Sequence, residues 1–311
     1  MRPPPYAPML ATPWPKAFSD DGWLFEPKWD GIRGVVTWDT ESAEIHTRRG
    51  TEVSSRYPEL TRLEGLPPCV LDGEIVVLGD AGVPSFERLQ QRMNRLGPRA
   101  TAHPVSFIAF DLLHFDGGPL TTEPLEARIE RLASLALPAP YARIEPTEGD
   151  GLSLWTVVAE RDLEGMVAKR LGSRYRPGTR SPDWRKIHNL HTARVVVGGF
   201  TAGDGGRAPT FGALLLGLPA EGALRWVGAV GSGFSDEALS VIRTALDEMR
   251  SERSPFHPDP EIPAATWVEP NLVAAVGYRN WTAAGRLRHP VFKGFTDDDP
   301  EEITWDGERP L

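Results

Sequence analysis

Residues 26–33 read Glu-Pro-Lys-Trp-Asp-Gly-Ile-Arg and place a lysine in a turn. Lys28 lies two positions before an Asp-Gly pair, and Arg33 follows that pair after one further residue. A deprotonated lysine amine can attack the α-phosphate of a nucleotide and hold the monophosphate as a phosphoramidate, if nearby cations or a metal lower the pKa of the amine. Gly31 permits a tight turn, Asp30 can bind metal or accept a proton, and Arg33 can hold ribose or phosphate. By itself the pattern also fits a surface hairpin with a solvated lysine.

The chain is long enough for two domains, because 311 residues exceed one typical core. No stretch approaches the roughly 20 apolar residues of a membrane-spanning helix. The N-terminus lacks the apolar core of a signal peptide. Cys69 is the single cysteine and cannot form an internal disulfide, which fits a reducing cytoplasm and a role in packing.

The basic residues are clustered, although the net charge of −9 argues against a protein that coats DNA. Arg48 and Arg49 are adjacent, and residues 169–186 contain seven Lys and Arg with Asp183 as their only acid. A third group follows the spacing of one helical face until Pro98 interrupts it. We interpret such clusters as phosphate contacts. The third group consists of Arg88, Arg92, Arg95 and Arg99.

The first part of the chain is predicted to be α+β with many short strands. Helices are indicated at 85–96, with Ser85 as N-cap, and at 122–135. The alternation of apolar residues indicates strands at 34–38, 44–47, 70–78, 105–115 and 163–170, the first two forming a hairpin.

A boundary near residues 188–193 is expected to divide the chain into domains at 1–190 and 191–311. Beyond it, one helix is indicated at 236–249, with Ser235 as N-cap. Several strands with one inserted helix predict a small barrel of the oligonucleotide-binding (OB) type. These strands are punctuated by glycine and lie at 194–200, 213–217, 224–230, 267–269 and 272–278.

Six stretches in a fixed order carry a resemblance to a known superfamily. Together they resemble the nucleotidyltransferase core shared by ATP-dependent DNA ligases, RNA ligases and mRNA capping enzymes. Residues 7–11, 26–31 and 287–294 are similar to the ligases of bacterial end joining. The resemblance implies an α+β nucleotidyltransferase (adenylation) domain followed by an all-β OB-fold barrel with one helix. The six stretches are 28–33, 47–50 (Thr-Arg-Arg-Gly), 71–74 (Leu-Asp-Gly-Glu), 107–113, 164–169 and 184–188.

The resemblance implies a role for each matched residue. Lys28 would carry AMP, Asp30 would assist the later steps, and Glu164 would bind Mg²⁺ or Mn²⁺, which carboxylate oxygen suits. The alternative for Glu164 is an ion pair with Lys169, and the alternative for Phe110 is a place in the core instead of a stack on adenine. The other implied contacts are Glu26 with the adenine edge, Arg33 and Glu74 with the ribose, Lys169 and Lys186 with the nucleotide phosphates, and DNA with Arg48, Arg49, Arg88 and Arg92, of which Arg48 would bind the 5′-phosphate of a nick.

The implied enzyme is an ATP-dependent DNA ligase of repair and recombination by non-homologous end joining. Lys28 attacks the α-phosphate of ATP, AMP passes to the 5′-phosphate of a nick, and the 3′-hydroxyl then displaces AMP. We expect a monomer that is cytoplasmic and nucleoid-associated. Its expected partner is nicked double-stranded DNA, and no membrane partner is expected. A Ku-like end-binding protein, or a separate polymerase or phosphoesterase, would be a further partner.

Two alternatives remain open, an RNA ligase or GTP-using capping-type enzyme and a nick-binding accessory protein with impaired self-adenylation. The chain departs from the family pattern at two places, of which the second, residues 296–299, motivates the accessory protein. His188 stands where the family has a second lysine, and a neutral imidazole gives no fixed charge near pH 7. Residues 296–299 read Thr-Asp-Asp-Asp, where the family has an arginine and then Asp-Lys that orient pyrophosphate. Arg288 and Lys293 are candidate replacements.

The second domain is also acidic. Residues 191–311 contain 11 Lys and Arg against 17 Asp and Glu. A barrel that clamps DNA is expected to be more basic, so we expect weak and salt-sensitive binding of DNA.

The Asp299→Lys variant should self-adenylate faster than the wild-type chain. It restores a cation at a place where acidic side chains would repel the triphosphate. The rate at which label moves from α-labelled ATP to the protein measures the effect. An unchanged rate would mean that other residues already orient the pyrophosphate.

Overall fold

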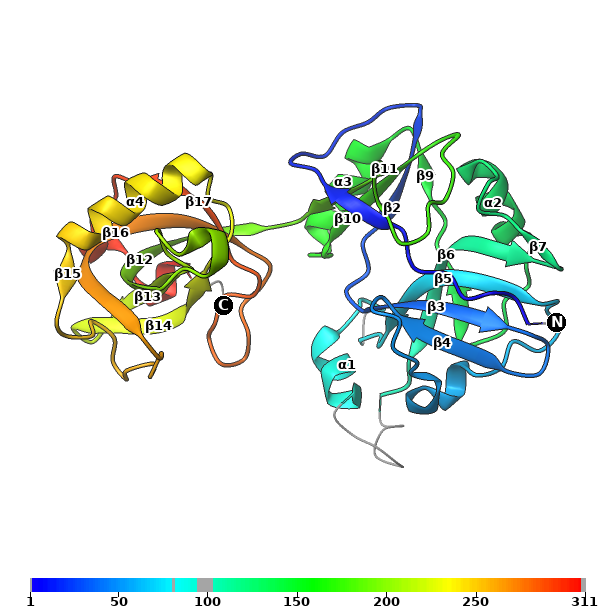
Figure 1. Ribbon diagram of the computed structural model, residues 1–311, viewed down its shortest axis with the longest axis horizontal. Helices are drawn as coiled ribbons and strands as arrows, with labels where there is room; N and C mark the ends of the chain where they lie inside the picture. Colours follow the sequence, from blue (N-terminus) through cyan, green and yellow to red (C-terminus); the bar gives the residue numbers. More distant parts are fainter. Residues whose placement is uncertain (1, 80–81, 94–102, 309–311) are drawn as a thin grey trace. The chain divides into compact units, whose positions relative to one another are not determined.

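A computed structural model describes residues 2–79, 82–93 and 103–308. The chain divides into two compact units, Met1–Asn189 (unit 1) and Leu190–Leu311 (unit 2). Each unit has its own sheets and its own core (Figure 1). Within the described ranges, no helix is long and apolar enough to cross a membrane.

Unit 1 contains two sheets whose facing sides enclose a core. The first sheet (sheet A) packs one face against helix α3 (Gly151–Glu160), with Phe25 and Met166 fully buried there. Successive side chains of a strand point to opposite faces, so Glu26, between Phe25 and Pro27, belongs to the other face of sheet A. The strands of sheet A, in spatial order, are β1 (Leu10–Pro13), β11 (Arg180–His188), β10 (Gly165–Arg170), β2 (Trp23–Pro27) and β9 (Thr147–Glu148).

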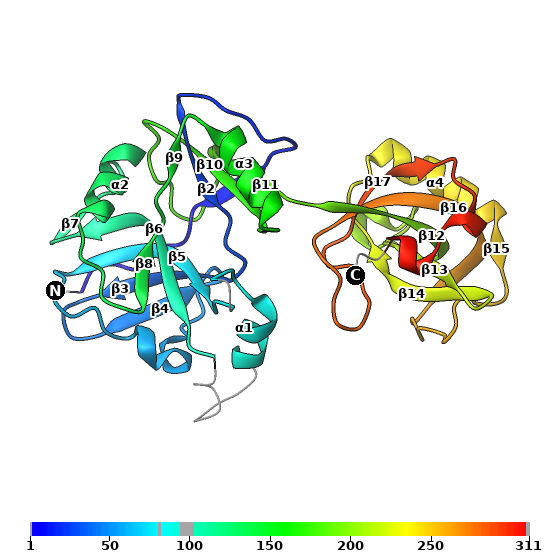
Figure 2. The same ribbon diagram turned by 180° about the vertical axis from the view of Figure 1, so that it is seen from behind.

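The second sheet of unit 1 (sheet B) buries both of its faces. One face carries Leu71 and Phe107 in a large core. The other carries Val35 and Phe110, which share a core with Trp184 of sheet A. Figures 1 and 2 show the two sheets side by side. The strands of sheet B, in spatial order, are β4 (Ala43–Thr47), β3 (Ile32–Trp38), β5 (Cys69–Val76), β6 (Ser106–Phe115) and β7 (Gly118–Pro119), with β8 (Tyr141–Arg143) parallel to β6.

The single cysteine lies in the larger core of unit 1. Cys69 begins β5 and its side chain is fully buried. Burial raises the pKa of the Cys69 thiol to about 12. The packing role expected from the sequence is confirmed.

The helices of unit 1 differ in part from the prediction. Helix α1 covers Phe86–Met93, and the expected continuation to residue 96 lies outside the described residues, as do Arg95 and Arg99. Helix α2 covers Leu125–Ala133 instead of 122–135, because Pro124 takes extended torsions as its N-cap. Helix α3 was not predicted. Short 3-10 turns lie at Ser54–Arg56 (η1) and Pro58–Leu60 (η2).

Unit 2 is the predicted OB-type barrel with helix α4 (Asp236–Glu248) inserted into it. The Ser235 side chain accepts from the Ala238 N–H, which confirms it as the N-cap. One long strand, β16, replaces the two strands expected between residues 267 and 278. The other elements are β12 (His191–Thr201), η4 (Gly205–Arg207), β13 (Leu214–Ala220), β14 (Ala223–Val230), β15 (Arg250–Ser251), β16 (Ala265–Tyr278), β17 (Val291–Thr296), η5 (Pro300–Glu302) and α5 (Trp305–Glu308).

The barrel curves where a glycine interrupts the pairing. Strand β12 pairs with both β13 and β16, and in both registers Gly198 is skipped. A Cβ atom at Gly198 would lie 2.6 Å from the Phe256 ring, so only glycine fits. Such bulges bend a strand and increase its twist, which lets a small sheet close on itself.

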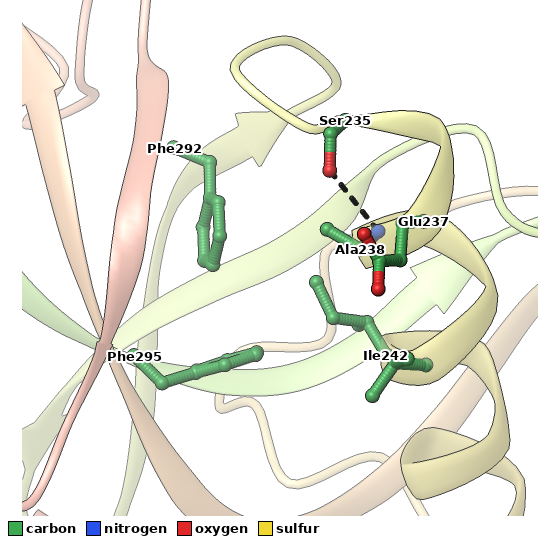
Figure 3. A pocket seen from close by; sticks show the side chains of 7 residues that line it. Ser235, Glu237, Ala238, Ile242, Phe292 and Phe295 are labelled. Atoms are coloured by element: carbon green, nitrogen blue, oxygen red, sulfur yellow. Dashed lines mark hydrogen bonds between the residues drawn. The ribbon is translucent and has the colours of Figure 1, made fainter.

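A hollow of about 370 Å³ lies between α4 and β17 (Figure 3). Phe292 and Phe295 of β17 line one side of it and Ile242 of α4 the other, and Ser235 and Glu237 lie at the helix start. It contains none of the site residues predicted from the sequence.

A buried ion pair fastens α2 to sheet B. The Arg128 guanidinium donates to both carboxylate oxygens of Asp111, at 2.7 and 2.9 Å, and both side chains are fully buried. Arg128 also donates to the carbonyls of Glu123 and Ser173. Its removal would leave the buried Asp111 carboxylate without a cation, with only the Leu112 N–H bonded to it at 2.9 Å.

Arg128→Ala should therefore lower the free energy of unfolding of unit 1 by about 3–5 kcal/mol. Urea denaturation followed by circular dichroism measures the loss. The control is Arg161→Ala, which removes an exposed arginine at the end of α3. Equal stability of the two variants would contradict this role for the pair.

Candidate active site

The register of sheet A brings the predicted site residues onto one face. Glu26 of β2 lies opposite Val167 of β10, which lies opposite Lys186 of β11. Because alternate residues of a strand share a face, Lys28 lies on the same side as Glu26. Lys169 likewise lies on the same side as Val167. Residues that are distant in sequence thus meet in one row.

Lys28 leaves the end of β2 and pairs with Glu164. Its N–H donates to the Gly165 carbonyl at 2.8 Å, which holds the backbone beside the start of β10. Its Nζ donates to Glu164 Oε2 at 2.5 Å. The other carboxylate oxygen of Glu164 lies 3.8 Å from His188 Nδ1. Glu164 therefore bridges the candidate nucleophile and the histidine that replaces the family's second lysine, and the alternative ion pair with Lys169 is not formed.

The surroundings of Lys186 are cationic. Burial and the charges of Lys28, Arg180 and Arg48 lower the pKa of Lys186, and Glu164 opposes that shift. Cations held this close repel one another unless an anion lies between them. Arg48 and Arg49 are exposed on the turn that follows β4. This group of cations is suited to hold phosphate.

A hydrogen-bond network fixes the second predicted arginine. Arg33 Nε and Nη2 donate to the two oxygens of Asp72 at 2.6 and 2.7 Å. The Tyr175 hydroxyl donates to Asp72 at 2.6 Å and accepts from the Met9 N–H at 2.8 Å. Arg33 Nη2 also donates to the Met9 carbonyl at 3.3 Å. The guanidinium is thereby held with its Cζ 4.3 Å from the centre of the Phe110 ring.

Glu74 of β5 is paired with Arg33 of β3, the neighbouring strand in sheet B. Burial raises the pKa of Glu74 to about 8, although the charges of Lys28 and Arg33 oppose the shift. The Glu74 side chain is half-buried and close to the nucleophile. Its carboxyl group is positioned to bond to a ligand placed between Lys28 and Arg33.

Phe110 lies where sheet A and sheet B meet. It is 8% exposed and packs edge-on against Trp184 at 6.2 Å between ring centres. Lys169 Nζ lies 4.6 Å from each of these rings and bonds to the Phe110 carbonyl at 2.7 Å and to Glu26 at 2.8 Å. Burial raises the pKa of Glu26, and Lys169 opposes that shift. Lys169 and Glu26 therefore lie at the end of the row beside Phe110 and Trp184, which we call its aromatic end.

The remaining predicted residues are less clearly placed for chemistry. Asp30 is half-buried in the loop between β2 and β3. Arg88 is half-buried in α1. In the described part of the chain, no group of three or more His, Cys, Asp and Glu is placed to hold a metal. Substrate phosphates and water commonly complete the coordination of a metal that a protein holds through one or two carboxylates.

Arg92 requires a correction. Its side chain is 4% exposed, and it donates to the Arg56 carbonyl at 2.7 Å and contacts Glu59 at 3.3 Å. The guanidinium is turned into unit 1, where it holds α1 against the 3-10 turns. The buried Arg92 side chain is therefore not available to contact DNA, contrary to the expectation from the sequence.

The acidic segment of unit 2 is bound within its own unit. Asp298 pairs with Arg194 at 2.9 Å, and Arg194 also pairs with Glu308 at 2.7 Å. Asp299 accepts from the Glu301 N–H as the N-cap of η5. Loss of such a cap costs about 1 kcal/mol, so the Asp299→Lys measurement needs a parallel check of stability.

Sequence reasoning assigned no role to three residues of this site. Asp72 is one of two acids in β5, beside Glu74, and lies within a matched stretch. Trp184 lies in another matched stretch. Tyr175 gave no signal, because it reaches Asp72 from a loop distant in sequence.

Family models match both units. The model for the ATP dependent DNA ligase domain matches residues 8–188, more than half of the chain. The model for the ATP dependent DNA ligase C terminal region matches residues 207–299. The chain belongs to the family of ATP-dependent DNA ligases. ATP is the nucleotide that this family uses, and DNA is its substrate.

Relatives are found among end-joining and prophage ligases. The multifunctional non-homologous end joining protein LigD of Mycolicibacterium smegmatis is 38% identical over 98% of this chain and 40% of its own length. The SPbeta prophage-derived DNA ligase-like protein LigB of Bacillus subtilis is 30% identical over 93% of this chain and 98% of its own. This chain therefore spans well under half of LigD and nearly the whole of LigB.

A solved structure shares the fold. Mycobacterial DNA ligase D, complexed with ATP and MES, is 36% identical with a TM-score of 0.56, covering 96% of this chain and 98% of that one. The predicted architecture, a nucleotidyltransferase domain followed by an OB-fold domain, is confirmed.

Glu74 provides a test of the electrostatics of the site. Because folding raises the pKa of this carboxyl to about 8, the folded chain holds the proton more tightly than the unfolded chain. The free energy of unfolding should therefore fall as pH rises from the usual carboxyl range to the folded value. Glu74→Gln stays neutral and should gain stability relative to wild type between about pH 5 and about pH 9.

Urea midpoints of both proteins at the two pH values measure the gain. Glu145→Gln, an exposed carboxyl of unit 1, controls for the loss of charge. A constant difference between wild type and Glu74→Gln would contradict the assigned environment of Glu74.

Proposed function

We propose that this chain seals 3′-hydroxyl/5′-phosphate nicks or ends in DNA through a lysyl-AMP intermediate, in repair by non-homologous end joining. The observation that carries the proposal is the arrangement around Lys28. A carboxylate oxygen of Glu164 lies 2.5 Å from the Lys28 Nζ. The charge of Lys28 also acts to lower the pKa of Lys186 and the pKa of Glu74. A nucleophile, a carboxylate and a phosphate-binding lysine are the groups that self-adenylation requires.

In the first step, Lys28 Nζ forms a bond to the α-phosphorus of ATP, and the bond to the bridging oxygen of pyrophosphate breaks. The amine must first lose a proton. Glu164 is hydrogen-bonded to it and is the carboxylate positioned to accept that proton. Lys186 would hold the phosphates, and Arg48 would hold the 5′-phosphate of the nick in the second step. Asp30 would assist the later steps.

The base would lie at the aromatic end of the row. Phe110 would stack on adenine, with Glu26 at the adenine edge. Because Lys169 is held between Phe110 and Trp184, we assign it to this end instead of to the phosphates. Glu74 would accept from a ribose hydroxyl. Arg33, held by Asp72, would contact the ribose from the other side.

Glu164 is suited to hold Mg²⁺, or Mn²⁺ in its place. Its oxygens are hard ligands, and Mg²⁺ in proteins commonly takes one or two carboxylates with substrate phosphates and water. Such a metal neutralises charge on the triphosphate when it is bound. Arg48, Arg49 and Arg88 are the proposed DNA contacts of unit 1.

The similarity to LigD motivates the proposed setting. A Ku-like end-binding protein, or a separate polymerase or phosphoesterase, would act beside a monomeric ligase at the nucleoid. The hinge that reorients the two domains between steps would lie at residues 189–193, where the proposed domains 1–190 and 191–311 join.

Lys28→Arg tests the nucleophile. Arginine keeps a cation beside Glu164 but cannot attack phosphorus at neutral pH, because its guanidinium stays protonated. Incubation with α-labelled ATP and Mg²⁺ should leave label on denatured wild-type protein. The Lys28→Arg variant should retain at least about a thousandfold less label than wild type. Lys16→Ala removes an exposed lysine of the same unit and should adenylate normally.

The substrates distinguish the alternatives. ATP and a DNA nick should support the reaction, and GTP or an RNA nick should not. Sealing of a pre-adenylated nick by a chain that forms no adduct would confine the defect to the first step. Appreciable self-adenylation by Lys28→Arg would sink the assignment, and failure of wild type in both assays would favour an accessory protein.

A further inference from the structure

Residues 7–11 are joined by hydrogen bonds to the loop that precedes β11. The Leu10 N–H donates to the Thr179 carbonyl at 2.8 Å, and the Met9 N–H donates to the Tyr175 hydroxyl at 2.8 Å. The stretch 7–11 resembles the ligases of bacterial end joining, although all five of its side chains are apolar. Its backbone, and not its side chains, therefore has to supply any polar contact with the site.

Tyr175, Asp72, Arg33 and Met9 form a closed ring of hydrogen bonds. The Tyr175 hydroxyl accepts from the Met9 N–H and donates to Asp72 Oδ2 at 2.6 Å. Asp72 accepts from Arg33, whose Nη2 also donates to the Met9 carbonyl at 3.3 Å. Met9 and Asp72 are fully buried, and Tyr175 is 3% exposed. Because water does not reach these groups, a bond lost from the ring is not replaced by a bond to solvent.

The position of the Asp72 carboxylate depends on Tyr175. In the part of the chain that the structure describes, the Asp72 side chain bonds only to Arg33 and to Tyr175. Burial raises the pKa of the Tyr175 phenol well above its usual value, and the Asp72 charge adds to the shift, so the hydroxyl remains a donor. The Tyr175 ring is itself fixed, because it packs edge-on against Trp184 at 5.7 Å and its N–H donates to the Thr121 carbonyl at 3.0 Å.

Asp72 holds Arg33 by one edge of the guanidinium and leaves the other edge open. Nε and Nη2 of Arg33 bond to Asp72, and no group among the described residues bonds to Nη1. The Arg33 side chain is 20% exposed, with its Cζ 4.3 Å from the centre of the Phe110 ring. Nη1 can therefore bond to a ligand that lies against Phe110. A guanidinium fixed in advance loses little further freedom when it binds, which lowers the entropic cost of binding.

We infer that Tyr175 is a positioning residue, which holds Arg33 through Asp72 for contact with the ribose of ATP, and that the Met9 backbone closes the ring. The inference rests on the proposed function, in which Arg33 contacts the ribose. The ribose is remote from the phosphorus that reacts, so this contact stabilises bound ATP and the transition state equally. Loss of the Tyr175 hydroxyl should therefore weaken the binding of ATP without slowing the step that follows.

Tyr175→Phe tests the positioning role, because it keeps the ring that packs against Trp184 and removes only the hydroxyl. Self-adenylation is followed with α-labelled ATP over a series of ATP concentrations. The concentration that gives half the maximal rate constant should rise roughly tenfold, since a hydrogen bond to a charged group is lost. The rate constant at saturating ATP should stay within about twofold of wild type. Neither quantity depends on how much of the protein is folded, so partial unfolding would not imitate this result.

Tyr141→Phe is the matched control. Tyr141 is 5% exposed, and its hydroxyl donates to the Leu60 carbonyl in the large core of unit 1. The control therefore also removes a buried hydroxyl, but from the face of sheet B that does not carry Phe110. Its half-maximal ATP concentration should equal that of wild type, whatever stability it loses in urea. An equal rise in Tyr141→Phe and Tyr175→Phe would indicate a general effect on the fold and would overturn the inference.

Arg33→Ala distinguishes an action through Arg33 from a direct role of Tyr175. Arg33→Ala should itself raise the half-maximal ATP concentration, by at least as much as Tyr175→Phe. Adding Tyr175→Phe to Arg33→Ala should produce no further rise, because the group that Tyr175 positions is already absent. A further rise of about tenfold in the double variant would show that Tyr175 acts on ATP by another route and would overturn the inference.

Equilibrium binding separates this inference from the proposed function. Calorimetric titration with ATP in EDTA, which removes the metal that adenylation is proposed to use, gives dissociation constants for wild type and for each variant. If wild type formed no adduct but the dissociation constants followed the same pattern, the proposed function would fail and Tyr175 would keep its positioning role. A normal adduct in wild type, with ATP affinity unchanged by Tyr175→Phe, would leave the proposed function intact and overturn the inference.

Discussion

A cation between the two sheets of unit 1 is stable only with an anion beside it, and the site is organised by this constraint. Arg33 pairs with Asp72, Lys169 with Glu26 and Lys28 with Glu164. Charges removed from water without partners would cost several kcal/mol each. The chain thus provides the nucleotide site with its own counterions.

These pairs differ in how readily a ligand could replace them. Lys169 and Glu26 are almost fully buried, and Asp72 is fully buried. Lys28 is 24% exposed and Glu164 16% exposed, so this pair can be reached from solvent. The buried pairs fix the geometry of the row, and the accessible pair is left for exchange with substrate.

Much of this architecture follows from the sequence, for reasons that particular elements make clear. Strand β6 and helix α4 were predictable because their apolar periods are clear and Ser235 marks the start of the helix. Lys28, Glu74, Phe110 and Lys186 were identified through matched stretches.

The parts that were not predicted depend on packing between distant segments. Helix α3 begins within Gly149-Asp150-Gly151, a sequence typical of a loop, and forms because its side chains cover one face of sheet A. The inward turn of Arg92 depends on Glu59 and on the Arg56 carbonyl. The Tyr175–Asp72 bond joins residues 103 positions apart. Helical spacing predicts which residues share one face of a helix, but it does not predict whether that face is exposed to water.

The buried thiol of Cys69 makes unit 1 convenient for chemical study. Alkylating reagents react with the thiolate, and burial keeps the Cys69 pKa near 12. Unit 2 contains no cysteine. A pulse of maleimide would therefore mark only those molecules whose first unit has opened. In addition, an exposed cysteine introduced into unit 2 could be labelled selectively in the folded protein without first replacing the natural one.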